Sequence, residues 1–208
     1  IKLRGSLWMI QKITKPDDLF ALALEEMAKA TSSAKHEFHT FTLGTVHQGF
    51  PHLRTVVLRK FERECVNILF HTDIRSAKID HLQKCPEVSL LSYGYKLRLQ
   101  VSFNGVAYIE KDPEITQYQF ENSSGDSQKC YAYDARPGSM IHGKKKEELQ
   151  PHIQLPLTSD QLSTAKDNFV VVRIVPDKCD VLYLHHSGHI RIPANRTSEG
   201  WVSDFITA

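Results

Sequence analysis

Residues 53–61 read LRTVVLRKF, a run rich in β-branched and apolar side chains that is typical of a β-strand. Runs of the same kind precede and follow it, FHTFTLGTV at 38–46 and CVNILFH at 65–71. Short links with glycine, proline or charged residues separate the three runs at 49–51 and 63–64. Strands joined by links this short predict an antiparallel meander.

Outward from the meander, helical patterns appear on both sides. Residues 15–33 carry an apolar stripe at helical spacing, and Pro16 suits the first turn of that helix. A second helix is expected after Thr72-Asp73, with Pro86 as its stop. Further strands are expected at 87–93, 97–110, 169–175 and 179–184, followed by a hairpin and a short strand around Trp201.

Residues 112–168 interrupt this series of strands. A helix is expected from Asp112-Pro113, loops at 121–128 and 135–139, and a helix with a connector at 143–168. The six or seven strands around the interruption favour a mainly β fold, because antiparallel strands avoid bare edges by closing into a barrel. We expect one domain over residues 1–208, with its barrel core at about 38–110 and 169–206.

Charge and composition narrow the range of partners. The chain has 208 residues and a formal net charge of +2, too mild to argue for nucleic acid or an anionic membrane. No apolar stretch approaches the ~20 residues of a membrane helix, and residues 1–10 show no signal-peptide cleavage site. The lysines at 144–146 precede two glutamates and read as a solvated helix face.

The cysteines indicate the redox compartment. They are far apart and form neither a CxxC pair nor a metal-binding spacing. This pattern predicts free thiols in a reducing, cytoplasmic setting. The four positions are Cys65, Cys85, Cys130 and Cys179.

The second helix carries two cations at its N-terminal end, Arg75 and Lys78. A helix N-terminus is already positive, so each cation there costs roughly a few tenths of a kcal/mol. A phosphate held by free backbone N–H groups, Ser76 and both cations would reverse that cost. Ordinary surface cations are the alternative, and this segment alone does not separate the two.

Three more polar positions have a plain explanation beside a functional one. Arg54 and Arg59 lie an odd number of residues apart, so a regular strand points them to opposite faces. An edge strand with solvent-facing charges accounts for both. Gln100 falls on the polar face of the strand at 97–110, where a glutamine is usually only solvated.

Three segments in order and spacing resemble a known family: RTVVLR at 54–59, FHTDIRSAK at 70–78 and LQV at 99–101, in a strand that runs to Gly105. They are similar to the FMN-binding split barrels of the pyridoxamine 5′-phosphate oxidase family. The resemblance implies a six-stranded antiparallel split β-barrel with peripheral helices. It also implies a homodimer, with FMN bound in clefts between the subunits.

Carried over position by position, the resemblance implies a role for individual residues. Arg54, Ser76 and Lys78 would bind the FMN phosphate, and Arg75 would substitute for a family arginine that is Ala77 here. Arg59 and His189 would lie on the substrate side. The other implied flavin contacts are the backbone of Thr55, Val56, Val57 and Leu58, the side chains of Arg59, His71, Thr72 and Gln100, and Arg191 reaching the partner subunit's flavin.

The departures from the family pattern concern the substrate. Two arginines expected around a substrate phosphate read Asn122 and Ser187 here, although Tyr118 matches a family tyrosine. The resemblance therefore implies an FMN-dependent oxidoreductase whose small-molecule substrate is not pyridoxamine or pyridoxine 5′-phosphate. Flavin carries the hydride chemistry, so no side chain is identified as catalytic.

Two other functions stay open. A flavin- or haem-binding protein without turnover is one, because His185, His186 and His189 offer ligands for iron. A polar hairpin is the favoured explanation of these histidines, since no cysteine or carboxylate completes a metal site. The other is an interaction module without a cofactor, which leaves the placement of Arg75 and Lys78 unexplained.

Overall fold

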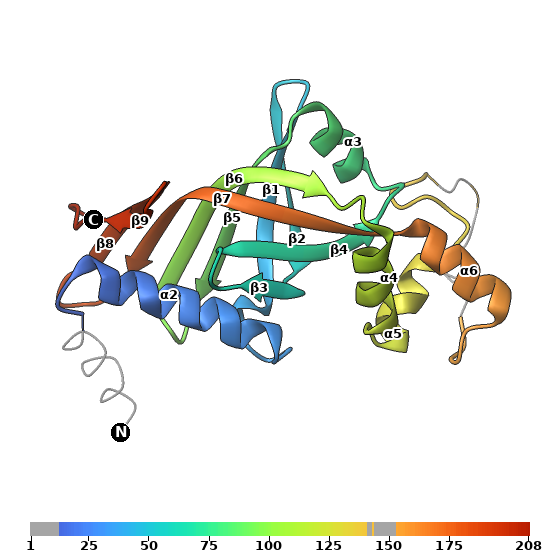
Figure 1. Cartoon of the computed structure of the whole chain (residues 1–208), viewed down its shortest axis with the longest axis horizontal. Helices are drawn as coiled ribbons and strands as arrows, with labels where there is room; N and C mark the ends of the chain where they lie inside the picture. Colours follow the sequence, from blue (N-terminus) through green and yellow to red (C-terminus); the bar gives the residue numbers. More distant parts are fainter. Residues whose placement is uncertain (1–12, 141–142, 144–152) are drawn as a thin grey trace.

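A computed structural model of the protein describes residues 13–140, 143 and 153–208. The described residues form one antiparallel sheet of nine strands, in the order β2-β1-β5-β6-β7-β4-β3, with β8 and β9 added beside β7. Figure 1 shows that the sheet curves without closing on itself. The strands are β1 (Thr40–His47), β2 (Phe50–Val57), β3 (Lys60–Glu62), β4 (Asn67–Asp73), β5 (Glu87–Gly94), β6 (Leu99–Ile109), β7 (Phe169–Tyr183), β8 (Ile190–Thr197) and β9 (Gly200–Ser203).

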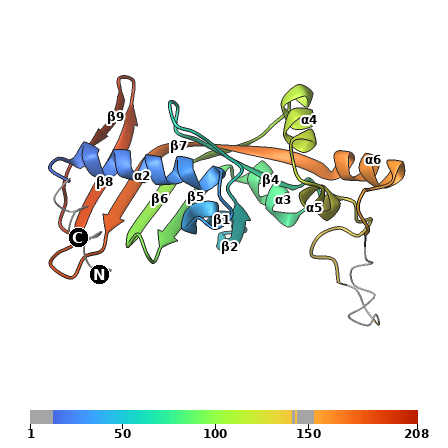
Figure 2. The ribbon, with the colours of Figure 1, turned by 90° about the horizontal axis from the view of Figure 1, so that it is seen from below.

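Strand β7 gives the sheet its split form. Along one side it pairs with β6 over nearly its whole length. Along the other side, its first half pairs with β4 and its second half with β8. Figures 1 and 2 show β7 running the length of the molecule, from α6 at one end to the β8–β9 hairpin at the other. One strand therefore joins two sub-sheets that diverge from its middle.

A β-bulge lies where β7 changes partner. The register of β6 against β7 shifts between Asn104 and Gly105, opposite Pro176. A Cβ atom on Gly105 would lie 2.5 Å from Pro176 Cα and still closer to the Val175 carbonyl oxygen. Proline donates no ladder hydrogen bond and is tolerated within sheets mainly at edges or bulges. The glycine lets the two backbones approach here, so β7 continues through Pro176.

Helix α2 runs along the sheet, α3 lies beside β1, and α4, α5 and α6 gather at one end (Figures 1 and 2). Helix α2 packs against the sheet and supplies Leu19 and Met27 to the main core, which includes Phe41 and Phe70. A smaller cluster around Phe169 lies under the helices that follow β6. The helices are α2 (Pro16–Thr31), α3 (Ala77–Lys84), α4 (Pro113–Glu121), α5 (Gly125–Gln128) and α6 (Ser159–Asn168), with 3₁₀ turns η1 (Glu37–His39) and η2 (Lys129–Tyr131).

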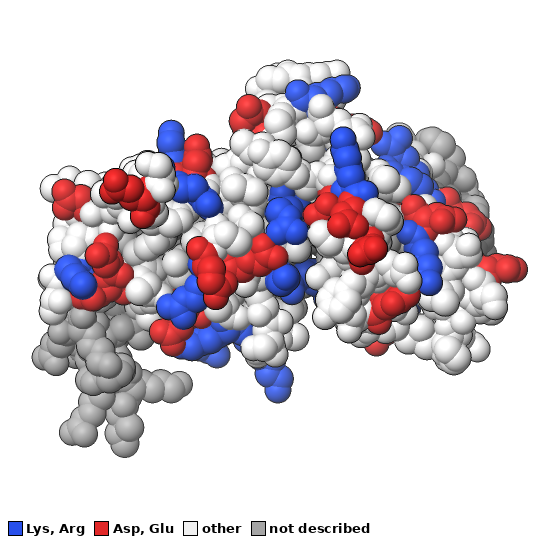
Figure 3. Space-filling model, in the orientation of Figure 1, with Lys and Arg blue, Asp and Glu red and all other residues white. Residues whose placement is uncertain are grey.

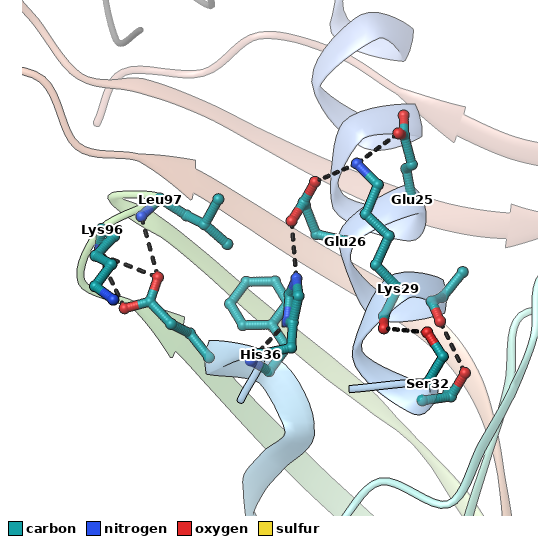
Figure 4. Close-up of polar contacts among 11 residues, drawn as sticks. Glu25, Glu26, Lys29, Ser32, His36, Lys96 and Leu97 are labelled. Atoms are coloured by element: carbon teal, nitrogen blue, oxygen red, sulfur yellow. Dashed lines mark hydrogen bonds and ion pairs between the residues drawn. The ribbon is translucent and has the colours of Figure 1, made fainter. Parts of the chain in front are cut away.

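A polar network fastens the end of α2 to η1 and the β5–β6 turn (Figure 4). Buried Glu26 accepts from Lys29 Nζ at 2.8 Å and lies 3.0 Å from His36 Nε2. Glu37, the next residue, accepts from the backbone N–H groups of Lys96 and Leu97 at 3.0–3.3 Å. These bonds fix the entry into β1, which leads to the candidate site.

The expected mainly β antiparallel fold with peripheral helices is confirmed, with differences in detail. Residues 53–61 form two strands rather than one, because the chain changes neighbours at Leu58 and Arg59. Leu58 N donates to the His39 carbonyl of the β1 side, whereas Arg59 N donates to the Leu69 carbonyl of β4. This corner separates β2 from β3 and raises the number of strands.

Two other expectations differ from the structure. The strands expected at 169–175 and 179–184 are one strand, β7, because the bulge absorbs Pro176. The loop expected at 121–128 contains α5, whose first turn is capped by Ser124. The expectations for residues 1–10 and 144–148 fall outside the described residues.

Candidate functional site

Two cations of the predicted phosphate site lie close together at the start of α3. Lys78 Nζ donates to Thr72 Oγ1 at 2.8 Å and to Ser76 Oγ at 3.1 Å. Arg54, from β2, donates through Nη1 to Thr45 Oγ1 at 2.6 Å and to the carbonyls of His52 and Leu43 at 2.8 and 3.3 Å. The corner between β4 and α3 thus faces the hairpin of β1 and β2.

The electrostatics of this corner favour an anion. Burial, and next the charge of Arg54, lower the pKa of Lys78, while Asp73 opposes them. Burial also lowers the pKa of Arg54. Within the described part of the chain, the hydrogen bonds of both cations go to hydroxyl and carbonyl groups, not to carboxylates. Two half-buried cations with neutral partners fit a phosphate.

The helix itself adds donors to the corner. Helix α3 begins at Ala77 after the N-cap residue Ser76, whose side chain makes no capping hydrogen bond. The first backbone N–H groups of a helix lack intrahelical partners and attract anions. The Ser76 hydroxyl is buried beside Thr72 and Lys78. The corner therefore combines backbone donors, a hydroxyl and two cations.

Arg75 has a local partner that explains its position before α3. Its Nε and Nη2 donate to Asp73 Oδ1 and Oδ2 at 3.0 and 2.7 Å. The same guanidinium donates to the carbonyls of Tyr133 and Asp134 at 2.9 Å. Asp73 thus balances the charge of Arg75, and Arg75 in turn holds the chain after η2. A direct phosphate contact by Arg75 stays a prediction.

A cavity of about 230 Å³ lies on the other side of β4, between the end of α2 and α4. Arg59 reaches it from the corner after β2, and its Nη2 donates to Ser127 Oγ at 3.2 Å. His71 lies 3.2 Å through Nε2 from Gln119 Oε1. Burial, and next the charge of Arg59, lower the pKa of His71 to about 4. The cavity therefore contains a neutral imidazole beside a guanidinium.

Two buried polar atoms at this cavity have no partner among the described residues. They are Nε of Arg59 and Nδ1 of His71. The side chains of Asn122, Ser123 and Ser124 line the same cavity. Asn122, where the resemblance leads us to expect an arginine, lines the same cavity as Arg59. Unpaired buried groups of this kind mark a place where a ligand is expected to bind.

The remaining predicted site residues lie elsewhere on the sheet. Gln100 pairs with Tyr93 of β5 and Leu182 of β7. Arg191 in β8 forms an ion pair within its own chain, Nε to Asp180 at 3.0 Å. Thr55 is exposed, Val56 and Val57 are half-buried, and Leu58 is buried. Their flavin contacts stay predictions.

The histidines of the C-terminal hairpin bond to one another and to the turn. His185 Nδ1 lies 2.6 Å from Ser187 Oγ, and the backbone N–H of His185 donates to His189 Nδ1 at 3.2 Å. The rings of His185 and His186 are tilted relative to each other, with centroids 4.1 Å apart. Across the residues described, no group of three or more His, Cys, Asp or Glu is arranged to hold a metal ion.

The structure also shows a histidine stack that sequence reasoning missed. His47, His52 and His81 come from β1, β2 and α3, and the rings of His47 and His81 are parallel at 4.5 Å. His81 Nδ1 lies 3.0 Å from Thr45 Oγ1, the hydroxyl that Arg54 contacts. The sequence signal was weak, because His47 and His52 merely flank a hairpin turn. Only the fold brings α3 onto them.

On the face seen in Figure 3, basic and acidic side chains alternate, and no large patch carries charge of one sign. The cations at the start of α3 are therefore a local feature. No helix in the described part of the chain is long and apolar enough to cross a membrane.

Comparisons with known proteins agree with this geometry. The family model described as "Pyridoxamine 5'-phosphate oxidase, FMN-binding domain" matches residues 19–111. A pyridoxine/pyridoxamine 5′-phosphate oxidase from Acinetobacter baylyi is 33% identical over 148 residues, 71% of this chain and 64% of that protein. The protein of the same name from Sodalis glossinidius is 31% identical over 142 residues, 68% of this chain and 62% of that protein.

A solved structure shows the same fold. It is a pyridoxamine 5′-phosphate oxidase-related, FMN binding protein from Nostoc punctiforme. It is 21% identical and has a TM-score of 0.68, covering 89% of this chain and 96% of that one. The chain spans less than two thirds of the length of the two oxidases above.

The fold is that of the split barrels, and the domain model that matches residues 19–111 is FMN-binding. The chain is similar to the pyridoxamine 5′-phosphate oxidase-related, FMN-binding split-barrel family in sequence over residues 19–111 and in fold. This agrees with the family and the cofactor expected from the motifs at 54–59, 70–78 and 99–101.

Proposed function

We propose that this protein is an FMN-dependent oxidoreductase acting on a small molecule. The observation that carries the proposal is the pair of half-buried cations, Arg54 and Lys78, whose described partners are neutral. When bound, FMN supplies hydride and electron transfer to the substrate. The chain supplies binding and orientation, with Arg54, Ser76 and Lys78 on the phosphate.

The flavin ring would extend from the corner between β4 and α3 along the end of β2. Residues 55–58 run from Arg54 to the end of β2. There the backbone changes its hydrogen-bonding neighbour, from His39 before β1 for Leu58 to Leu69 of β4 for Arg59. Thr72 and His71 lie on β4 beside this path. We propose that the backbone of 55–58 and these two side chains contact the ring, which leaves Arg59 on the substrate side.

We propose that two copies of the chain form a homodimer that completes the flavin site. The outward face of β2 and β5 exposes large apolar side chains, Leu53 at 71%, Tyr93 at 46% and Leu91 at 40%. Gln100 pairs with Tyr93 and so lies on this face. A second copy would cover it and bring the partner subunit's Arg191 to the flavin. Light scattering of the FMN-loaded protein tests this, and a monomer that binds FMN tightly contradicts it.

The substrate is proposed to differ from pyridoxamine and pyridoxine 5′-phosphate. Two cations of the segment that follows α5, Lys129 and Arg136, are already bound to Asp126 and Asp80. Neither is free to replace the arginine that is Asn122 here. A buried phosphate dianion is costly without paired cations. We expect little oxygen-dependent formation of pyridoxal 5′-phosphate, and a kcat/KM of ~10⁴ M⁻¹s⁻¹ or more, ordinary for an enzyme, contradicts this.

The cellular setting is proposed to be the cytoplasm. All four cysteines of the chain are free in the structure. Free thiols of this number are usual in a reducing compartment.

Comparing FMN with riboflavin, which lacks the phosphate, tests the proposed binding site. Each charge-assisted contact is worth about 1.5–3 kcal/mol, so loss of one lowers the affinity about 10- to 150-fold. Lys78→Met should weaken FMN by this factor and leave riboflavin unchanged. Lys84→Met, in the last turn of the same helix, is the matched control and should change neither. Equal affinities of the parent protein for FMN and riboflavin contradict the proposal.

A further inference from the structure

Arg59 leaves most of its hydrogen-bonding capacity unused. A guanidinium has five N–H donors. Among the described residues, its one hydrogen bond is the 3.2 Å contact from Nη2 to Ser127 Oγ, and Nε is buried without a partner. Buried donors are normally satisfied, so this position indicates a missing acceptor.

Arg75 shows in the same chain how such a guanidinium is satisfied. Its Nε and Nη2 form two parallel hydrogen bonds to the carboxylate of Asp73, at 3.0 and 2.7 Å. The same edge of Arg59 faces no carboxylate, because the cavity lining around it consists of apolar, hydroxyl, amide and imidazole groups. The planar fork of arginine matches a carboxylate in geometry better than it matches a single hydroxyl.

The charge of the cavity suits a single negative group. Among the residues that the structure describes, Arg59 is the one lysine or arginine in the cavity lining. The acidic residue nearest in sequence to Ser127, Asp126, is paired with Lys129. His71 is held neutral by burial, which lowers its pKa to about 4. A dianion such as a phosphate ester would bury one charge without a partner, which is costly. The amides of Gln119 and Asn122 are neutral groups that suit the rest of a small polar ligand.

We propose that this cavity binds the carboxylate of the substrate, with its two oxygens on Nε and Nη2 of Arg59. The substrate class is a small monoanionic carboxylic acid. This inference rests on the proposed function, because the carboxylate would anchor the substrate beside bound FMN. The ligand would take the place of the Ser127 hydroxyl, which keeps a second contact at 3.2 Å to Ser124 Oγ.

Calorimetric titration of the FMN-loaded protein with matched probes tests the proposal. Benzoate and butyrate carry a carboxylate, benzamide is neutral, and phenyl phosphate is a dianion. Both carboxylates should bind about tenfold or more tightly than the other two probes. Arg59→Lys keeps the charge but removes the fork, and should abolish most of this preference. Arg63→Lys, the same change in the exposed turn after β3, should leave it intact.

The FMN content of each variant is measured before any probe is added. A parent protein that does not retain FMN refutes the proposed function and never reaches the titration. An FMN-loaded protein that binds neither carboxylate overturns the present inference and leaves the proposed function standing. Phenyl phosphate binding as tightly as benzoate, or a preference unchanged in Arg59→Lys, overturns it as well.

Discussion

Replacing Gly105 by alanine should destabilise the protein strongly, although it adds only a methyl group. The new Cβ would lie 2.5 Å from Pro176 Cα and closer still to the Val175 carbonyl oxygen. Both are backbone atoms, so no side-chain rotation relieves the clash and β6 must move away from β7. Overpacking of this kind costs about 1–3 kcal/mol, and a rigid neighbour favours the upper end of the range. For a chain of this length, 3 kcal/mol lowers Tm by roughly 6–12 °C.

Thermal unfolding followed by circular dichroism measures the effect. Gly44→Ala is the matched control, because it also lies in a strand but meets the flexible end of Leu53 at 3.3 Å and the Ser89 carbonyl oxygen at 3.4 Å. We expect that control to change the free energy of unfolding by less than about 1 kcal/mol. Equal Tm values for the two variants would refute the argument that the bulge requires glycine.

Three further outcomes follow from described contacts. In the unfolded state, His71 takes up a proton below its ordinary pKa of 6.5, whereas in the folded state it does so only near pH 4. The free energy of unfolding should therefore decrease as the pH is lowered from 6.5 to 4. His71→Gln should remove about 2 kcal/mol of the fall between pH 7 and pH 5, seen as a smaller Tm difference between those two pH values. Arg75→Ala leaves the buried Asp73 carboxylate unpaired and should cost about 3–5 kcal/mol in denaturant titrations, which Asp73→Asn in the same chain should partly restore. Cys179 is buried and its pKa is raised, so Ellman's reagent should label it only after unfolding, unlike the exposed thiols.

The sequence predicts the local elements well because their signals are local. The alternation in 38–46 and 87–93 and the stripe in 15–33 correspond to β1, β5 and α2. The break at Leu58 and Arg59 has no local signal, since VVLRK reads as continuous strand. It depends on carbonyl groups of two other strands, which only the folded chain brings near.

The candidate site likewise contains residues that the sequence predicts and residues that only the folded chain brings together. Lys78 and Ser76 stand at a helix start that the sequence predicts, and the structure brings Arg54 to them. The partner of Arg75 was visible two residues earlier as Asp73, although an acid so near in sequence is easily overlooked. The roles of Thr45 and His81 depend on the packing of α3 against β1, which no spacing in the sequence encodes.

The position of β7 late in the chain has a consequence for biosynthesis. Strands β4 and β6 are made early, but each pairs with β7, which follows the whole helical excursion. Until residues 169–183 leave the ribosome, both strands have an unpaired edge that invites association with other chains. The segment 19–111 that matches the family model ends before β7. Made alone, it would lack the strand that joins its two halves, so it should aggregate, and the sheet should form completely only after residues 169–183 have been translated.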